Sequence, residues 1–319
     1  MRTRTGWRRG LLGALASVTA ALGLTAGLVQ PAAAADGTPR AVTMYRHTSE
    51  AGDSVGQGTS VSYTSATASI EGGGSTPESA RVRVFADDTW WEVTLAAPKG
   101  DTLRPGVYRN VEKAAFRTGR APGLDVSGRG RGCDDVYGQF AVNQVEIDAT
   151  TGQVAVLDAT FTQRCGSPTA PALKGAVKYR AFPLSYSYTS DPDDWVGRGA
   201  GTTHTGATST FDARKWAGGA GIAYSVSGKR EYYSALMTPP TGEQFEVGRT
   251  YPVAETNAEG VAGLTVSGNG RACSSVTGHL TFTRLARAED GTIKAFAATY
   301  VQHCGGSEAG MRGTIRYYA

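Results

Sequence analysis

The sequence GLDVSGRGRGC at residues 123–133 returns as GLTVSGNGRAC at residues 263–273. Shorter matches continue outward from it in the same order. They pair residues 48–58 with 189–199, residues 163–165 with 302–304, and residues 175–179 with 313–317. Self-similarity along a chain indicates duplication, and a unit of about 140 residues can bury its own core. We therefore predict module 1 at residues 36–181 and module 2 at residues 182–319.

The first 35 residues are predicted to be a signal peptide. Four arginines lie between Arg2 and Arg9, an apolar run extends from Leu11 to Val29, and small residues follow at Ala32–Ala35. A basic start, an apolar core and a small-residue end are typical of a secretory leader. A retained membrane anchor is the alternative, and both the general secretory and the twin-arginine routes stay open. We expect a secreted, extracellular protein whose mature part has no membrane span.

Charge gives no reason to expect nucleic acid as a partner. The whole chain has a formal net charge of +4, and four of its basic residues are the leader arginines Arg2, Arg4, Arg8 and Arg9. The mature chain is therefore close to neutral. A near-neutral surface lacks the basic footprint by which proteins bind nucleic acid or anionic lipid.

Four cysteines occupy matching positions, two in each module. An even number of cysteines in a secreted chain favours disulfides. Because each copy must have been closed before it was duplicated, we expect the pairs Cys133–Cys165 and Cys273–Cys304. A metal–thiolate site is the alternative, but closely spaced ligand pairs such as C-x-x-C are missing from the sequence.

Hydrophobic alternation predicts short strands. Apolar and polar residues alternate at 81–85, 91–95 and 153–156, as expected where one face of a strand is buried. A hairpin is expected between residues 139 and 156, and its copy between 279 and 301 contains the Asp-Gly turn at 290–291. The predicted fold is all-β, with two tandem antiparallel β-sandwich modules that are jelly-roll-like and carry one disulfide each.

The repeated residues resemble a widespread secreted bacterial module. Its pattern is G-D-x-x-G-x-G, then P-G-L-x-x-S-G-x-G-R-x-C, then Q-x-C followed by a G-x-x-x-Y strand. Module 1 carries the whole pattern, whereas module 2 departs from it at Asp193, Ala262 and Ala272. The family has no established activity, so the resemblance implies a tandem β-sandwich architecture and an extracellular location, and it names no ligand.

Acidic residues next to the first glycine-rich turn suggest a calcium site. They are Glu50 and Asp53 in module 1, and Asp191 and Asp194 in module 2. Several β-sandwich binding modules hold a structural calcium with carboxylates near a terminal strand. In the alternative interpretation, Asp53 and Asp194 accept hydrogen bonds from the backbone of their own turn. Apart from this calcium, we expect no cofactor.

Two aromatic pairs and two arginines are the other candidate ligand-binding residues. Trp90-Trp91 aligns with Tyr232-Tyr233. Neighbouring residues of a strand point to opposite faces, so one of each pair is expected in the core and the other can face solvent as a platform for a sugar ring. Both members can instead be packed. Arg131 and Arg271 can bind a carboxylate or anion, or can satisfy loop carbonyls near the disulfide.

No catalytic constellation is recognisable in the sequence. The four histidines, His47, His204, His279 and His303, occupy no position that is shared by the two copies, and neither G-x-S-x-G nor H-E-x-x-H occurs. We predict a non-enzymatic binding protein for a polysaccharide or cell-envelope ligand. A structural or protein-interaction module of the cell surface and an extracellular hydrolase or lyase are the alternatives. An exposed aromatic residue that recurs in both modules would favour the first.

Overall fold

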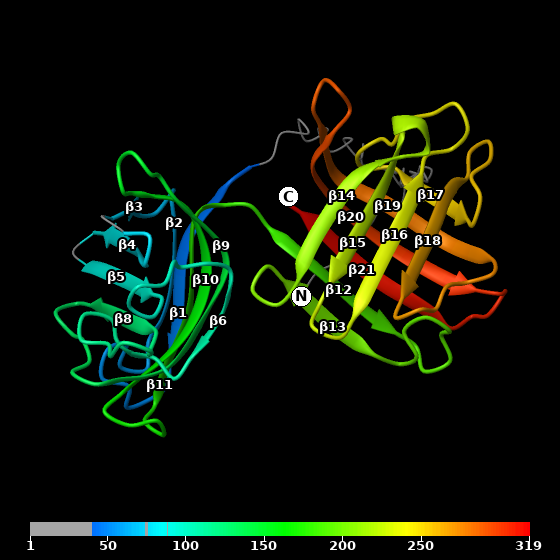
Figure 1. Cartoon of the computed structure of the whole chain (residues 1–319). Coiled ribbons are helices and arrows are strands. Elements are labelled where there is room, and N and C mark those ends of the chain that lie inside the picture. Colours follow the sequence, from blue (N-terminus) through cyan, green and yellow to red (C-terminus); the bar gives the residue numbers. More distant parts are fainter. Residues whose placement is uncertain (1–39, 74–75, 88) are drawn as a thin grey trace, which may run out of the picture. The chain divides into compact units, whose positions relative to one another are not determined.

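The computed structural model describes residues 40–73, 76–87 and 89–319 (Figure 1). The predicted signal peptide lies outside these residues. Strands form almost all of the regular structure, and the single helical element in the described part is a short 3₁₀ turn, η1 (Ala217–Gly219). No helix of the described residues is long and apolar enough to cross a membrane. The all-β prediction is confirmed.

Module 1 consists of two sheets that enclose one core (Figure 1, blue to green). The strand order is β2-β1-β11-β10-β9-β6 in the larger sheet and β3-β4-β5-β8-β7 in the smaller one. The strands are β1 (Val42–Ser49), β2 (Ser60–Thr64), β3 (Ser69–Gly72), β4 (Ser79–Ala86), β5 (Thr89–Ala96), β6 (Gly106–Arg109), β7 (Glu112–Lys113), β8 (Gly123–Gly128), β9 (Val136–Ile147), β10 (Val154–Cys165) and β11 (Ala172–Ala181). Neighbouring strands are antiparallel except β7 and β8.

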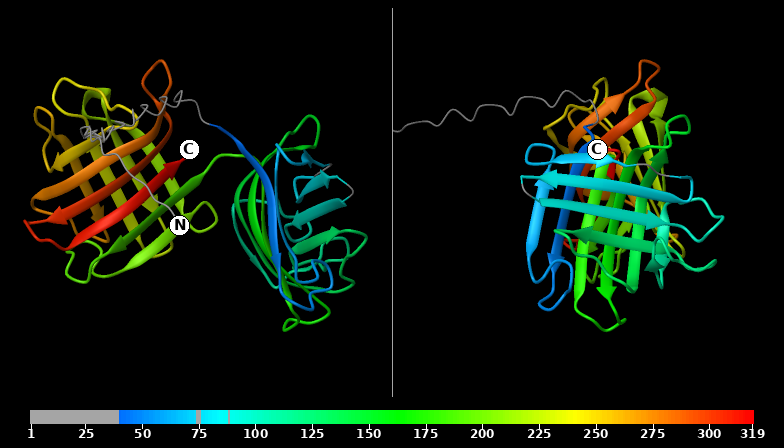
Figure 2. Two further views of the ribbon diagram at one scale, coloured as in Figure 1. Left: turned by 180° about the vertical axis from the view of Figure 1, so that it is seen from behind. Right: turned by 90° about the vertical axis from the view of Figure 1, so that its left-hand side faces the viewer.

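Module 2 repeats this arrangement in one ten-stranded sheet, ordered β13-β12-β21-β20-β19-β17-β18-β16-β15-β14. The strands are β12 (Leu184–Ser190), β13 (Gly201–Thr205), β14 (Thr210–Trp216), β15 (Gly221–Ser227), β16 (Tyr232–Thr238), β17 (Thr250–Ala254), β18 (Ala262–Gly268), β19 (Val276–Arg287), β20 (Ile293–Cys304) and β21 (Gly310–Tyr317). Figure 1 and the left view of Figure 2 show these strands as two facing layers. The two layers meet at β17, which pairs with β18 in one and with β19 in the other.

A single residue explains why the sheets are joined in module 2 but separate in module 1. Strands β6 and β7 take the place of the continuous β17, and Asn110 lies between them with a φ of 54°. A residue in this left-handed region cannot continue a strand, and asparagine adopts the region more readily than most residues. The regular pairing with β9 therefore ends at Arg109, and beyond Asn110 the Val111 amide donates once more to β9, to the Gly138 carbonyl at 3.3 Å.

The predicted hairpins are the longest strands of the protein. β9 and β10 in module 1, and β19 and β20 in module 2, have 12 residues each. In module 1 the turn is closed by Asp148, whose Oδ1 accepts hydrogen bonds from the amides of Thr150 and Thr151. Each disulfide links the loop before the first strand to the end of the second. The pairings Cys133–Cys165 and Cys273–Cys304 are confirmed, with Cα–Cα distances of 5.1 and 5.0 Å.

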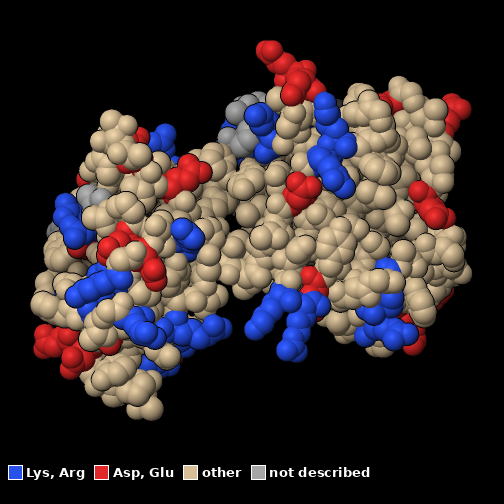
Figure 3. All heavy atoms as spheres, in the orientation of Figure 1, with Lys and Arg blue, Asp and Glu red and all other residues tan. Residues whose placement is uncertain are grey.

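The interior of each module is filled by the inward faces of its two layers. Its largest fully buried side chains are Trp91, Tyr45 and Phe140 in module 1 and Tyr186, Tyr251 and Tyr300 in module 2. Burial of such aromatic side chains is the main apolar contribution to stability. On the face that Figure 3 shows, basic and acidic side chains are interspersed and separated by wide uncharged areas, as the near-neutral composition predicts.

Candidate functional site

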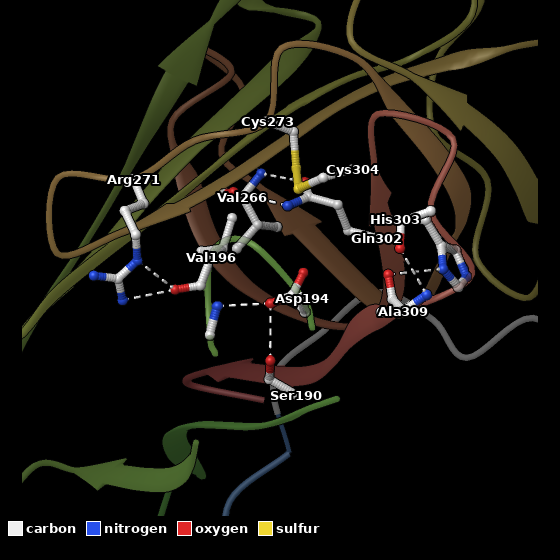
Figure 4. The surroundings of a disulfide bond; sticks show 12 residues. Ser190, Asp194, Val196, Val266, Arg271, Cys273, Gln302, His303, Cys304 and Ala309 are labelled. Atoms are coloured by element: carbon white, nitrogen blue, oxygen red, sulfur yellow. Dashed lines mark hydrogen bonds between the residues drawn. A yellow bond between two sulfur atoms is a disulfide. The ribbon is translucent and has the colours of Figure 1, made fainter. Parts of the chain in front are cut away.

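The G-D-x-x-G-x-G segment forms a tight turn around a buried aspartate. In module 1, Asp53 Oδ2 accepts hydrogen bonds from Ser49 Oγ at 2.8 Å and from the Gly56 amide at 2.6 Å. Asp194 makes the same two bonds in module 2, to Ser190 and to the amide of Gly197 (Figure 4). These bonds agree with the structural interpretation of the motif, in which the aspartate satisfies its own turn.

Glycine is required in this turn because two chain segments approach closely. A Cβ atom on Gly56 would lie 2.6 Å from the Cβ of Ser49, and a Cβ on Gly197 would overlap Ser190 in the same way. The residues that define the motif thus hold the turn together, and they leave little of it free for a ligand.

In each module, the acidic residues proposed to bind calcium have other hydrogen-bond partners. The Glu50 carboxylate accepts hydrogen bonds from Lys174 Nζ at 2.6 Å and from the Ala172 amide at 2.8 Å. These two hydrogen bonds lower the pKa of Glu50. Asp191 accepts hydrogen bonds from the amide of Gly310 and from Arg312, which lower the pKa of Asp191.

Too few oxygens remain for calcium in the described residues. Oδ1 of Asp53 and Oδ1 of Asp194 are buried and have no partner there. Calcium takes six to eight oxygen ligands, and no group of three or more His, Cys, Asp or Glu in this part of the chain is arranged to hold a metal. The geometry therefore offers no support for the predicted calcium site.

The S-G-x-G-R segment is a two-residue hairpin turn in both modules. The Gly128 amide bonds the Arg131 carbonyl and the Arg131 amide bonds the Gly128 carbonyl, at 3.0 and 2.9 Å. The two central residues, Arg129 and Gly130, have φ values of 53° and 73°, as a type I′ turn requires. Gly128 also lies against Trp91, whose ring a Cβ atom at this position would overlap.

The two arginines of this motif differ in their environment. Arg271 is partly buried and donates from Nε and Nη2 to the carbonyl of Val196, at 3.0 and 2.8 Å (Figure 4). It therefore has the structural role that was the alternative to ligand binding. Arg131 is exposed, and its guanidinium has no bonding partner among the described residues.

The glutamine of the Q-x-C segment has a role that sequence reasoning missed. Gln163 is fully buried; its Oε1 accepts from the Val126 amide at 2.7 Å and its Nε2 donates to the Val126 carbonyl at 2.8 Å. Gln302 makes the same pair of bonds to Val266 (Figure 4). The side-chain amide thus satisfies the backbone N–H and C=O of one residue in β8 or β18, as a neighbouring strand would do. Its recurrence in both modules was the available signal.

The two aromatic pairs each place one residue inside and one outside. Trp91 and Tyr233 are 1% and 2% exposed, so they are the core members of the two pairs and neither side chain is accessible to a ligand. Trp90 and Tyr232 are 41% and 50% exposed. The alternation of the strand decides this difference, since adjacent residues point to opposite faces.

Trp90 and Tyr232 occupy the same place in the fold. Each precedes the buried aromatic residue, and its carbonyl accepts a hydrogen bond from the turn residue Arg129 or Asn269, at 3.2 and 2.8 Å. Their cross-strand neighbours differ. Trp90 pairs with Phe85, which is 45% exposed, whereas Tyr232 pairs with Ser227.

Module 2 has a groove on the outer face of its larger layer, with a volume of about 700 Å³. A row of hydroxyl side chains crosses six strands in register on this face, and its first four members line the groove: Thr203, Ser187, Thr314, Thr299, Thr281 and Thr250. His279 and Arg312 also line the groove, and none of its lining residues is acidic. The corresponding row in module 1 is Ser62, Arg46, Ala176, Thr160, Ala141 and Val107.

The described histidines lie in four different settings. Burial lowers the pKa of His47 to about 4, against an opposing effect of the Asp53 charge. Burial also lowers the pKa of His204, whose Nδ1 lies 2.8 Å from Ser209 Oγ. His279 faces the groove, and His303 contacts the carbonyl of Ala309.

Fold and surface together define a disulfide-bearing protein of two β-sandwich modules, with exposed aromatic residues and a hydroxyl-lined groove on its outer sheet faces. No protein-family model, curated protein or solved structure matches the chain.

Proposed function

We propose that this is a secreted, non-catalytic protein that binds an extracellular polysaccharide or another hydroxyl-rich component of the cell envelope. The observation that carries the proposal is the exposed aromatic residue at the same place in both modules, Trp90 and Tyr232. The two disulfides support an oxidising, extracellular compartment.

Physical chemistry favours a sugar at such a position. Tryptophan and tyrosine have a broad apolar face and a polar edge, which suits a ring that is apolar on its faces and hydroxylated at its rim. Burial keeps Trp91 and Tyr233 rigid, and the adjacent turn fixes the backbone of Trp90 and Tyr232. The exposed rings are therefore presented in a defined orientation, which reduces the entropy cost of binding.

Two such positions on one chain suit a polymer. A repeating ligand can engage both modules, and the second contact then forms at a high effective concentration. The groove of module 2 adds hydroxyl donors and acceptors in a row, which a hydroxyl-rich chain can pair with.

A protein-interaction role is the second candidate, and one observation favours it. Trp90 forms an apolar pair with the exposed Phe85, whereas Tyr232 has Ser227 beside it. An apolar patch present in one module only is more typical of a protein contact than of a duplicated sugar site.

A pull-down on insoluble polysaccharides and cell-wall preparations tests the proposal. The mature protein is compared with Trp90→Ala, with Tyr232→Ala and with the double variant. Trp195→Ala is the control, because Trp195 is 51% exposed and aligns with Ser54 in module 1. We expect each single variant to weaken retention by about tenfold and the double variant to lose it. Full retention of the double variant, or no retention of the wild type on any polymer, contradicts the proposal.

A further inference from the structure

Module 1 contains a pocket of about 610 Å³ next to its disulfide. The walls come from β7, from the segment that runs from Asp134 into β9, and from Arg164 at the end of β10. Its volume falls within the usual range of small-ligand sites, 300 to 1,000 Å³.

Phe116 is the most exposed of the large hydrophobic residues described, at 76%, and it lines this pocket. The loop that carries it is firmly held. Arg117 donates to the carbonyls of Ala97 and Ala114, each at 2.8 Å, and to Glu78 at 2.9 Å. The Glu112 carboxylate accepts hydrogen bonds from the amide and the hydroxyl of Thr118. The exposed ring is thus presented by an anchored loop, which is the arrangement expected of a binding residue.

Unpaired polar groups surround the ring. Asp134 and Asp135 line the pocket and are exposed, and neither carboxylate has a bonding partner within the described part of the chain. Tyr137, 38% exposed, supplies a second aromatic surface. By contrast, both cations of the pocket are engaged. Lys113 Nζ donates to the Cys133 carbonyl at 2.6 Å and lies 5.7 Å from the centre of the Phe116 ring. Arg164 donates to the Ala170 carbonyl and lies 3.9 Å from the Glu50 carboxylate.

Module 2 has none of these groups at the matching positions. Ten residues separate the paired Glu112 and Gly123 of module 1, whereas eight separate Ala254 and Gly263. The shorter connection contains no aromatic residue. The alignment also replaces Asp134, Asp135 and Tyr137 by Ser274, Ser275 and Thr277. The pocket therefore belongs to module 1 alone and was not produced by the duplication.

We propose that this pocket binds one or two units of a neutral sugar. The aromatic rings of Phe116 and Tyr137 offer apolar contact to the face of a pyranose, and the free carboxylates of Asp134 and Asp135 accept hydrogen bonds from its hydroxyl groups. A sugar acid fits less well, because its charge would face two unpaired carboxylates. This inference rests on the proposed glycan-binding function but uses residues other than Trp90 and Tyr232.

Saturation-transfer NMR with the mature protein tests the proposal. The probes are cellobiose, maltose and N,N′-diacetylchitobiose, with glucuronic acid as the acidic comparison. We expect at least one neutral disaccharide to bind and glucuronic acid to bind more weakly. Phe116→Ala and the double variant Asp134→Asn/Asp135→Asn should each weaken binding by about tenfold. Phe85→Ala is the control, since Phe85 is also exposed but does not line the pocket, and it should bind like the wild type.

The failure of this proposal is distinguishable from failure of the proposed function. If the pocket binds sugar, the Trp90→Ala/Tyr232→Ala variant should still bind the disaccharide although it no longer binds the polymer. Absence of disaccharide binding by the wild type, or unchanged binding by the Phe116 and Asp134/Asp135 variants, overturns the pocket proposal and leaves polymer binding untouched.

Discussion

The first strand of module 1 buries Tyr45 and His47 beside Trp91, whereas module 2 buries Tyr186 and Tyr188 beside Tyr233 at the same places. In module 1, Tyr45 Oη lies 2.9 Å from His47 Nδ1, and the imidazole meets the Trp91 ring edge-on at 4.4 Å.

In module 2 the same space is filled by phenols. The hydroxyl groups of Tyr186 and Tyr300 are 2.7 Å apart, and those of Tyr188 and Tyr233 are hydrogen-bonded to each other. Phe161 stands in module 1 where module 2 has Tyr300.

One backbone thus accommodates two ways of pairing buried polar groups. The shared motif residues maintain the scaffold in both modules, while the enclosed residues differ. The pairs named above are hydrogen-bonded, whereas Nε2 of His47 and Nε1 of Trp91 are buried without a partner among the described residues. The difference also separates the modules chemically. His47 titrates in an accessible pH range, whereas burial raises the pKa values of Tyr186 and Tyr300 above that of an ordinary phenol.

The largest expected effect concerns what the modules share. Gln163→Leu and Gln302→Leu each keep most of the buried volume but leave a backbone amide and carbonyl, of Val126 or Val266, without partners. We expect each to lower the free energy of unfolding of its own module by about 4 kcal/mol. Hydrogen exchange read by mass spectrometry resolves the two modules, and Gln139→Leu on an exposed position is the control. A cost below about 1 kcal/mol in either module would show that the bonds are dispensable.

The disulfides provide the second comparison, in which the modules should behave alike. The bridges span 32 and 31 residues. The chain-entropy relation therefore predicts a loss of about 3–4 kcal/mol for either double Cys→Ser variant. The same exchange experiment measures this loss module by module. Clearly unequal losses would mean that native-state contacts around the bridges, and not loop closure, set their contribution.

The third prediction concerns the pH dependence of module 1. The pKa of His47 is about 4 in the folded protein, below its ordinary value of 6.5. The unfolded chain therefore binds more protons between these values, so the stability of module 1 falls as the pH drops from 6.5 to 4 and levels off below that. The expected loss is about 3 kcal/mol. The charge of Asp53 raises the pKa of His47 and the charge of Arg129 lowers it, so both residues contribute to the pH dependence.

His47→Gln isolates this effect, because glutamine keeps a polar partner for Tyr45 and does not titrate in this range. Hydrogen exchange of β5 and β8 should depend less on pH in the variant than in the wild type. Module 2 contains His204, whose pKa burial also lowers, so the comparison is made between variant and wild type within module 1. Equal pH dependence of the two proteins would refute the assignment to His47.

The smallest expected effect comes from making module 2 resemble module 1. Tyr300→Phe introduces the ring found at Phe161 and leaves the buried Tyr186 hydroxyl without its partner. We expect a loss of about 1–2 kcal/mol in module 2, visible in the exchange of β20 and β21. Tyr232→Phe, at an exposed ring, should leave stability unchanged. If Tyr300→Phe were more stable than the wild type, the hydrogen-bonded pair of Tyr186 and Tyr300 would be shown to destabilise the folded module.

Local pattern and repetition accounted for much of the fold. The all-β fold, the disulfide pairs and the long hairpins were predicted correctly, because repeated spacing and period-two alternation can be read directly from the sequence. The alternation also required that Trp90 and Trp91, or Tyr232 and Tyr233, face opposite sides. It did not say which member would be buried, since that depends on where the second layer packs.

An all-β fold, a repeated unit and one disulfide in each unit can be predicted from the sequence alone, because strand periodicity is a local signal and the cysteine spacing is a repeated one. The candidate binding surfaces, in contrast, depend on the tertiary structure. The row from Thr203 to Thr250 exists because six strands pair in one register, among them β12 and β21, which lie more than 100 residues apart in the chain. A shift of one residue in any of the six would turn its hydroxyl inward. The pocket at Phe116 depends in the same way on a loop that is held by bonds to distant residues, such as that between Arg117 and Glu78.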